Sequence, residues 1–66
     1  MEQTLRADQR VCVFDDPITE TRLEGIAVLI RKVSTLHRGE YWRVRFEGDS
    51  EIVERVVRLT NRVSTR

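Results

Sequence analysis

The stretch that decides the fold is Glu40-Tyr-Trp-Arg-Val-Arg-Phe-Glu-Gly-Asp-Ser-Glu-Ile-Val-Glu-Arg-Val-Val57. In its first half, Trp42, Val44 and Phe46 alternate with polar or charged residues, and a period of two is the period of a β-strand. The pattern predicts that these three side chains point into a core. It predicts that the intervening side chains face outward: Tyr41, Arg43, Arg45 and Glu47.

The second half of this stretch predicts a hairpin. Turn-forming residues at 48–50 interrupt the alternation, and a β-branched run from Ile52 to Val57 follows. The apolar residues of this run fall in both phases of a strand. A bulge near Glu54 and Arg55 would shift the phase and bring them onto one face. A helix over 50–63 is the alternative, but four valines in that segment weigh against it.

Residues 23–33 fit two interpretations. Apolar residues at helical spacing and a possible capping box at 21–24 favour a helix. Gly25 and the β-branched residues after it favour a strand, in which Ile26, Val28 and Ile30 alternate with Ala27, Leu29 and Arg31. We prefer the strand, with Gly25 as the bend or bulge that lets it curve between two halves of a barrel.

The remaining segments are short. A first strand is expected over 9–14, with Val11 and Val13 on one face. The other expected segments are a flexible N-terminal arm over 1–8, loops over 15–22 and 34–39, a one-turn 3-10 helix and a short last strand within 58–63, and a frayed tail over 64–66.

Length and composition predict one small soluble domain. A chain of 66 residues has room for a single, modest core. The single cysteine, Cys12, cannot form an internal disulfide, and no apolar run is long enough to cross a membrane. A polar N-terminus does not resemble a signal peptide. We therefore expect a cytoplasmic protein without a membrane association.

The expected order of elements resembles the SH3-like barrels, in particular KOW, Tudor and small bacterial or phage-type barrels. The resemblance covers residues 9–63, and the segments that carry it are Arg10-Val-Cys-Val13, Leu23-Glu-Gly-Ile-Ala-Val28, Trp42-Arg-Val-Arg-Phe-Glu-Gly-Asp49 and Val56-Val-Arg-Leu59. It implies an all-β fold, a small five-stranded SH3-like barrel with a short 3-10 turn near the C-terminus. Segments that the signalling SH3 domains and plasmid-type reductases of this fold use for their ligands are missing here.

The sequence offers little for enzyme chemistry, and we expect no catalytic residue, no cofactor and no metal. Its one histidine, His37, lies far from Cys12 in the chain, so a nucleophile and base pair is not indicated. One histidine and one cysteine also make a poor zinc site. The acidic residues Asp15, Asp16 and Glu20 share a loop and are typical of a solvated segment.

Nucleic-acid binding is the sharper hypothesis. Residues 31–66 carry nine basic against five acidic side chains, and all but one of the cations in the chain are arginines. Arginine suits contact with phosphates, and a tyrosine in the same row can stack on a base. The candidate DNA- or RNA-binding residues are Arg31, Lys32, Arg38, Tyr41, Arg43, Arg45 and Arg55.

Two other interpretations remain open. Arg43 and Arg45 could instead pair across strands with acidic residues such as Glu24, Glu51 or Glu54. The second interpretation is a protein partner or a homo-oligomer, in which outward-facing apolar residues are covered by another chain. The residues that would face such a partner are Ala27, Leu29, Val33 and Val57.

Overall fold

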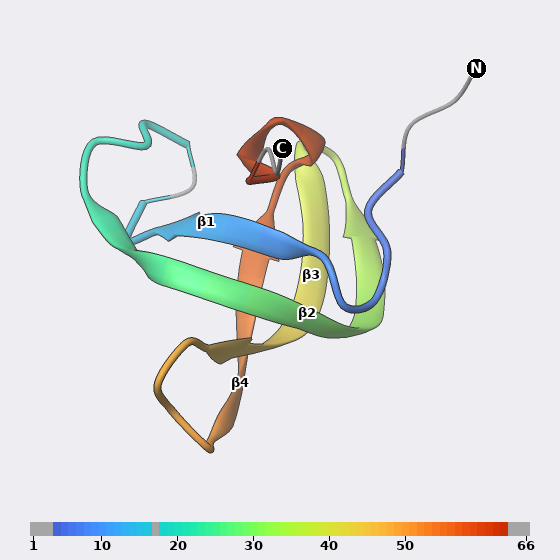
Figure 1. Ribbon diagram of the computed structural model, residues 1–66. Helices are drawn as coiled ribbons and strands as arrows, with labels where there is room; N and C mark the ends of the chain where they lie inside the picture. The colour runs from blue at the N-terminus through green and yellow to red at the C-terminus, as the bar shows by residue number, and fades with distance from the viewer. Residues whose placement is uncertain (1–3, 17, 64–66) are drawn as a thin grey trace.

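Four β-strands in chain order form one antiparallel sheet in the computed structural model (Figure 1). The structure describes residues 4–16 and 18–63. The elements are β1 (Arg10–Phe14), β2 (Leu23–Leu36), β3 (Gly39–Phe46), β4 (Ile52–Val57) and a 3-10 helix, η1 (Leu59–Asn61). The predicted all-β class, the strand at 23–33 and the strand after the turn at 48–50 are confirmed.

The long strand β2 connects the two halves of the sheet. Its first residues pair with β1, and residues 27–36 pair with β3. β1 and the first half of β2 cross over β3 and β4, so the sheet folds back on itself (Figure 1). The loop predicted over 34–39 is wrong, because β2 continues to Leu36 and only His37 and Arg38 form the turn. Residues 34–36 are exposed in both phases of the strand and so lack the apolar alternation that would have predicted it.

Irregularities in the sheet lie mainly in β2. The register of β1 against β2 shifts opposite Gly25, which confirms the predicted bulge there. Two further shifts against β3 leave Ile30 and Val33 as extra residues. The bulge predicted near Glu54 and Arg55 is wrong, because β4 pairs with β3 in one continuous register. β4 needs none, since Ile52 remains 51% exposed and only one phase of the strand faces the core.

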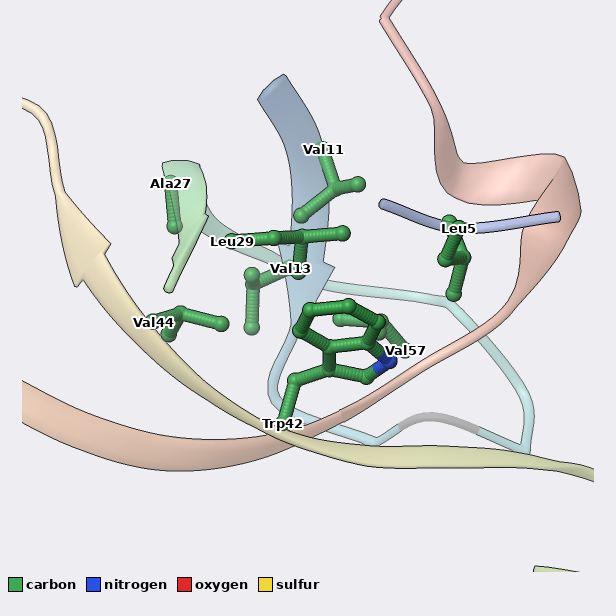
Figure 2. Close-up of a cluster of buried hydrophobic side chains, with 8 residues drawn as sticks. All are labelled: Leu5, Val11, Val13, Ala27, Leu29, Trp42, Val44 and Val57. Atoms are coloured by element: carbon green, nitrogen blue, oxygen red, sulfur yellow. The ribbon is translucent and has the colours of Figure 1, made fainter. Parts of the chain in front are cut away.

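The core lies between the two halves of the folded sheet. Figure 2 shows Trp42 and Val44 of β3 pointing toward side chains of β1 and β2, as the alternation predicted. The indole N–H of Trp42 donates to a carboxylate oxygen of Glu40 at 2.8 Å, so this buried polar group is satisfied. The buried cluster consists of Leu5, Val11, Val13, Ala27, Leu29, Trp42, Val44 and Val57.

The predicted phase of β2 is wrong. Ala27 and Leu29 are fully buried, whereas Val28 and Ile30 are only partly buried. Both phases of this segment are apolar, so alternation alone does not distinguish the buried phase from the partly exposed one. Val57 is fully buried as well, so of the four residues proposed to face a protein partner only Val33 is exposed, at 47%.

The segment before β1 contributes to the core. Leu5 is 8% exposed, and the amide of Asp8 donates to the carbonyl of Leu29 at 2.8 Å. A flexible arm was predicted over 1–8, and residues 1–3 of it lie outside the described residues. The described part therefore packs on the sheet through a residue for which the sequence pattern offered no signal.

The segment after β4 returns to β1. The predicted 3-10 turn is present as η1, and its buried Asn61 accepts from the amide of Arg58 and donates to Glu20. Beyond it, Arg62 forms an isolated bridge with Val11. Among the described residues there is no fifth strand, and the sheet is not closed into a barrel, which corrects the predicted architecture. The tail at 64–66 lies outside the described residues.

No helix in the described part of the chain has the length and apolar character needed to cross a membrane.

Candidate nucleic-acid interface

A row of charged side chains crosses the outer face of the sheet. Arg31 of β2 lies directly opposite Arg43 of β3, and Arg43 lies opposite Glu54 of β4. Directly opposed residues of an antiparallel pair share a face, and all three side chains are exposed. The predicted outward phase of Arg43 is confirmed. The pairing places two arginine residues directly opposite each other on neighbouring strands.

Arg31 reaches this face because of a bulge. Ala27 and Leu29 are buried, and in an uninterrupted strand residue 31 would share their inward phase. The register shift between Leu29 and Arg31 inserts Ile30 as an extra residue, which reverses the phase. Arg31 is therefore outward as predicted, but for a reason that the simple alternation did not contain.

The three cations at positions 31, 32 and 43 line one depression. Together with Val33 they enclose about 270 Å³. Lys32 approaches Glu40 at 3.6 Å, and Arg43 approaches Glu54 at 3.5 Å. The side chain of Arg31 has no ion pair or hydrogen bond within the described residues. We call Arg31, Lys32, Val33 and Arg43 the basic depression.

Two of the predicted site residues lie elsewhere. Tyr41 and Arg55 line a second depression of about 400 Å³ with three carboxylates: Asp15, Glu24 and Glu54. A hydrogen bond to Glu54, together with burial, raises the pKa of the Tyr41 hydroxyl. This acidic surrounding is unfavourable for a phosphate, so Tyr41 does not extend the basic depression.

Arg55 is held by a protein carboxylate rather than left free for a ligand. Its Nε and one terminal nitrogen donate to the two oxygens of Glu24 at 2.9 and 2.8 Å. Its guanidinium also lies 5.7 Å from the centroid of the Phe46 ring. The hydrogen bond from Arg55 lowers the pKa of Glu24 below its ordinary value. This geometry is that of a structural ion pair between β2 and β4.

The last two predicted residues lie at the turns of the hairpins. Arg45 donates to the backbone carbonyl of Asp49 at 3.1 Å and so stabilises the β3–β4 turn. Arg38 is exposed in the β2–β3 turn and lines a larger cavity. Of the pairings that the sequence offered as an alternative, Arg43 with Glu54 is present.

No family model, curated protein or solved structure matches this chain. Its function must therefore be inferred from its own side chains.

The histidine, cysteine and acidic side chains of the described residues form no candidate metal centre. Within the described residues, no three histidine, cysteine or acidic side chains gather in a way that could hold a metal ion. The loop carboxylates have structural roles: Asp16 accepts from the amides of Ile18 and Thr19, and Glu20 accepts from Asn61. The chemistry that the basic depression offers is the binding of an anion.

The sequence pattern missed one residue of the basic depression and one of the larger cavity. Val33 forms part of its wall because it is bulged, and a bulge has no signature in a β-branched run. Arg58, which lines the larger cavity, was assigned only to the C-terminal segment. Register and long-range contacts were needed to find both.

Proposed function

We propose that this chain is a non-enzymatic binding module that holds the phosphate backbone of a nucleic acid in the basic depression. The observation that supports it is the direct opposition of Arg31 and Arg43. Like charges in opposed positions on neighbouring strands destabilise a sheet. An arrangement of this kind is favourable when an anion lies between the two groups, and arginine can contact a phosphate with two parallel hydrogen bonds.

The charge balance around the depression supports the same proposal. Its three cations face two carboxylates, and both approach at 3.5 Å or more, outside the range of short charge-assisted hydrogen bonds. Loose surface pairs of this kind contribute little to stability, so a phosphate can displace them at small cost. Arg31, which lacks a described partner, is the residue on which we expect binding to depend most.

Protein association is less well supported. Three of the four residues expected to form that surface are buried: Ala27, Leu29 and Val57. The other large exposed apolar residues are distributed over loops and strands: Ile18, Leu23, Leu36 and Ile52. An apolar interface would not weaken as salt rises, so salt dependence separates the two functions.

The test is a fluorescence-anisotropy titration of the protein against a labelled mixed-sequence oligonucleotide, in DNA and RNA forms, over a range of salt concentrations. We expect the association constant to fall linearly with salt on logarithmic axes. Arg31→Gln and Arg43→Gln should each weaken binding and reduce the slope by about 0.7–0.9, the value for one lost phosphate contact.

The matched control is Arg22→Gln. Arg22 is 81% exposed and its nearest carboxylate lies 4.0 Å away, so the variant removes the same charge from a distant loop. We expect its slope to equal that of the unmodified protein, and Arg31→Gln to keep full thermal stability. Absence of binding at low salt, or equal losses in the Arg31 and Arg22 variants, would contradict the proposal.

A further inference from the structure

A cavity larger than the basic depression opens where four segments of the chain meet. It encloses about 590 Å³, within the range of small-molecule sites. Its walls are the chain before β1, the β1–β2 loop, the β2–β3 hairpin and η1. Figure 1 shows η1 next to the beginning of β3. The phosphate contact proposed above makes no use of this larger cavity.

The register separates the larger cavity from the basic depression. Thr35 and Glu40, which line the cavity, are directly opposed in the pairing of β2 with β3. Glu40 lies two residues before Trp42 and so shares its face of the sheet. Arg43 and the residue opposite it, Arg31, lie on the other face. A ligand in the cavity therefore does not need to contact the two arginines of the phosphate site.

Polar contacts hold the β1–β2 loop against η1. The buried Asn61 of η1 donates to the carboxylate of Glu20 at 2.9 Å. Within the loop, the amide of Glu20 donates to the carbonyl of Asp16 at 2.8 Å, and the carboxylate of Asp16 accepts from the amide of Ile18 at 2.9 Å. This wall of the cavity is therefore fixed by the protein's own hydrogen bonds, without a ligand.

The charged side chains of the larger cavity favour an anion. Arg38 and Arg58 line it together with one carboxylate, Glu40. That carboxylate already has partners, because one oxygen accepts from the indole of Trp42 at 2.8 Å and the other lies 3.6 Å from Lys32. The side chain of Arg38, in contrast, has no ion pair or hydrogen bond within the described residues. The two guanidinium groups therefore give the cavity an excess of positive charge.

The guanidinium of Arg58 is only loosely held. Its terminal nitrogens lie 3.4 Å from the carbonyl oxygen of Ile18 and 3.9 Å from the carboxylate of Glu20, longer than good charge-assisted hydrogen bonds. Its stem lies next to Gly39, where a Cβ would be 3.5 Å from the Cγ of Arg58. Since Arg38 precedes Gly39 in the chain, the two arginines extend from neighbouring points of the cavity wall.

Apolar side chains complete the lining of the larger cavity. They are Leu5, Ile18 and Leu59. Ile18 is 68% exposed, so a ligand that covers it removes apolar surface from water, which is favourable. A ligand that fits this lining combines an apolar body with an anionic group.

We propose that the larger cavity is a second binding site, which takes a small organic anion. The apolar body of the ligand packs on Ile18 and Leu59, and its anionic group contacts Arg38 and Arg58. An aromatic carboxylate or sulfonate has this chemistry. Because the basic depression lies on the other face of the sheet, this site does not depend on the function proposed above, and both sites can be occupied at once.

The test compares two fluorescent probes that differ only in charge. Anilinonaphthalene sulfonate carries an anionic group on an aromatic body, and phenylnaphthylamine has the same body without the sulfonate. The fluorescence of each probe rises in apolar surroundings, so a titration at low salt gives both dissociation constants. We expect the sulfonate to bind at least about tenfold more tightly, because hydrogen bonds from arginine to an anion are among the stronger polar contacts.

Two variants test whether the probe lies in the larger cavity. Arg38→Gln removes one guanidinium from an exposed turn, and Thr35→Phe fills the cavity from an exposed position of β2. We expect Arg38→Gln to weaken the sulfonate about three- to tenfold and leave the neutral probe unchanged, since one charged contact is lost. Thr35→Phe should weaken both probes, because it occupies the space of the apolar body.

The matched controls carry the same changes on the other face of the sheet. Arg31→Gln removes one guanidinium there, and Ser34→Phe adds a phenyl group opposite Tyr41. Both controls should bind the two probes as the unmodified protein does. Thermal unfolding followed by circular dichroism establishes that all four variants are folded.

The outcomes separate this inference from the proposed function. No binding of the sulfonate, equal affinity for the two probes, or equal losses in Arg38→Gln and Arg31→Gln would overturn the anion site. Unchanged binding in Thr35→Phe would overturn it as well. A saturating oligonucleotide should leave the affinity for the sulfonate unchanged, and its displacement would show that the sulfonate occupies the basic depression instead. If no oligonucleotide binds, only the proposed function fails.

Discussion

Trp42 and Arg43 are neighbours in β3 with opposite environments. Trp42 is 4% exposed within the core, and the side chain of Arg43 is 55% exposed above the sheet. The difference follows from the period of two along the strand. Trp42 therefore contributes to the core of the fold, and Arg43 is available to a ligand.

This contrast predicts unequal effects on stability. Trp42→Ala should lower the free energy of unfolding by about 3–5 kcal/mol, because it leaves a cavity in a small core. Arg43→Ala should change it by no more than about 0.5 kcal/mol, since its pair with Glu54 is long and exposed. Thermal unfolding followed by circular dichroism measures both. Equal losses would show that the face assignment of β3 is incorrect.

Gly39, at the start of β3, occupies a position where a residue with a side chain would fit poorly. Its φ is +141°, and a Cβ there would lie 2.9 Å from the carbonyl oxygen of Val57. Gly48 also has a positive φ, of +91°, but a Cβ there would meet no atom within 4 Å. A side chain at Gly48 would therefore cause backbone strain alone, whereas one at Gly39 would cause backbone strain and a steric clash.

We expect Gly39→Ala to destabilise the protein by about 2–4 kcal/mol, from strain and from the clash with β4. Gly48→Ala should cost only the strain, about 1–2 kcal/mol. Urea unfolding of the two variants gives the comparison. A cost for Gly39→Ala no greater than that for Gly48→Ala would mean that β4 moves away easily from the beginning of β3.

At the level of elements, the ion pair between Glu24 and Arg55 joins strands that are not hydrogen-bonded neighbours. β2 and β4 are separated by β3 in the sheet, yet the two side chains meet with two hydrogen bonds. Phe46 of β3 lies beneath the guanidinium. The contact therefore ties the folded-over halves of the sheet at one edge of the molecule.

The pH dependence of stability should report this ion pair. The hydrogen bond from Arg55 holds the pKa of Glu24 below its ordinary value of 4.5, so the folded state binds this proton less readily than the unfolded state. The stabilisation is therefore present above about pH 5 and is lost as pH falls through the lowered pKa. Glu24→Gln should remove about 0.5–1 kcal/mol near neutral pH and less in acid.

Chemical unfolding at pH 7 and at pH 3 measures this difference. Glu51→Gln is the control, because it removes one negative charge from an exposed residue that lies just before β4 and outside the depression around Arg55. A cost of Glu24→Gln that is the same at both pH values would contradict an electrostatic role for this pair.

For the whole molecule, the sequence predicted the strands better than their arrangement. β3 was assigned correctly because only one of its phases is apolar. β2 was assigned to the wrong face because both of its phases are apolar, and its two bulges against β3 reverse the phase along its length. Whether a sheet closes into a barrel depends on contacts between segments that are distant in the sequence, which periodicity does not encode.

The candidate site was predicted only in part, because the periodicity of one strand contains no information on its register or on distant partners. The exposure of Arg43 could be predicted from alternation, whereas that of Arg31 depends on the bulge at Ile30, and the direct opposition of the two depends on the register. Tyr41 and Arg55 line the second depression, which is acidic because the fold brings Asp15 and Glu24 to them from a distant part of the chain. A local pattern contains no information on such partners.

The hydrogen bond from Trp42 to Glu40 has an optical consequence. The chain has a single tryptophan, and the carboxylate that its indole contacts lies between Lys32 and the large cavity. Indole emission responds to charge and polarity near the ring. The tryptophan emission of the unlabelled protein therefore comes from one position, and its wavelength is sensitive to any molecule that displaces Lys32 or approaches Glu40.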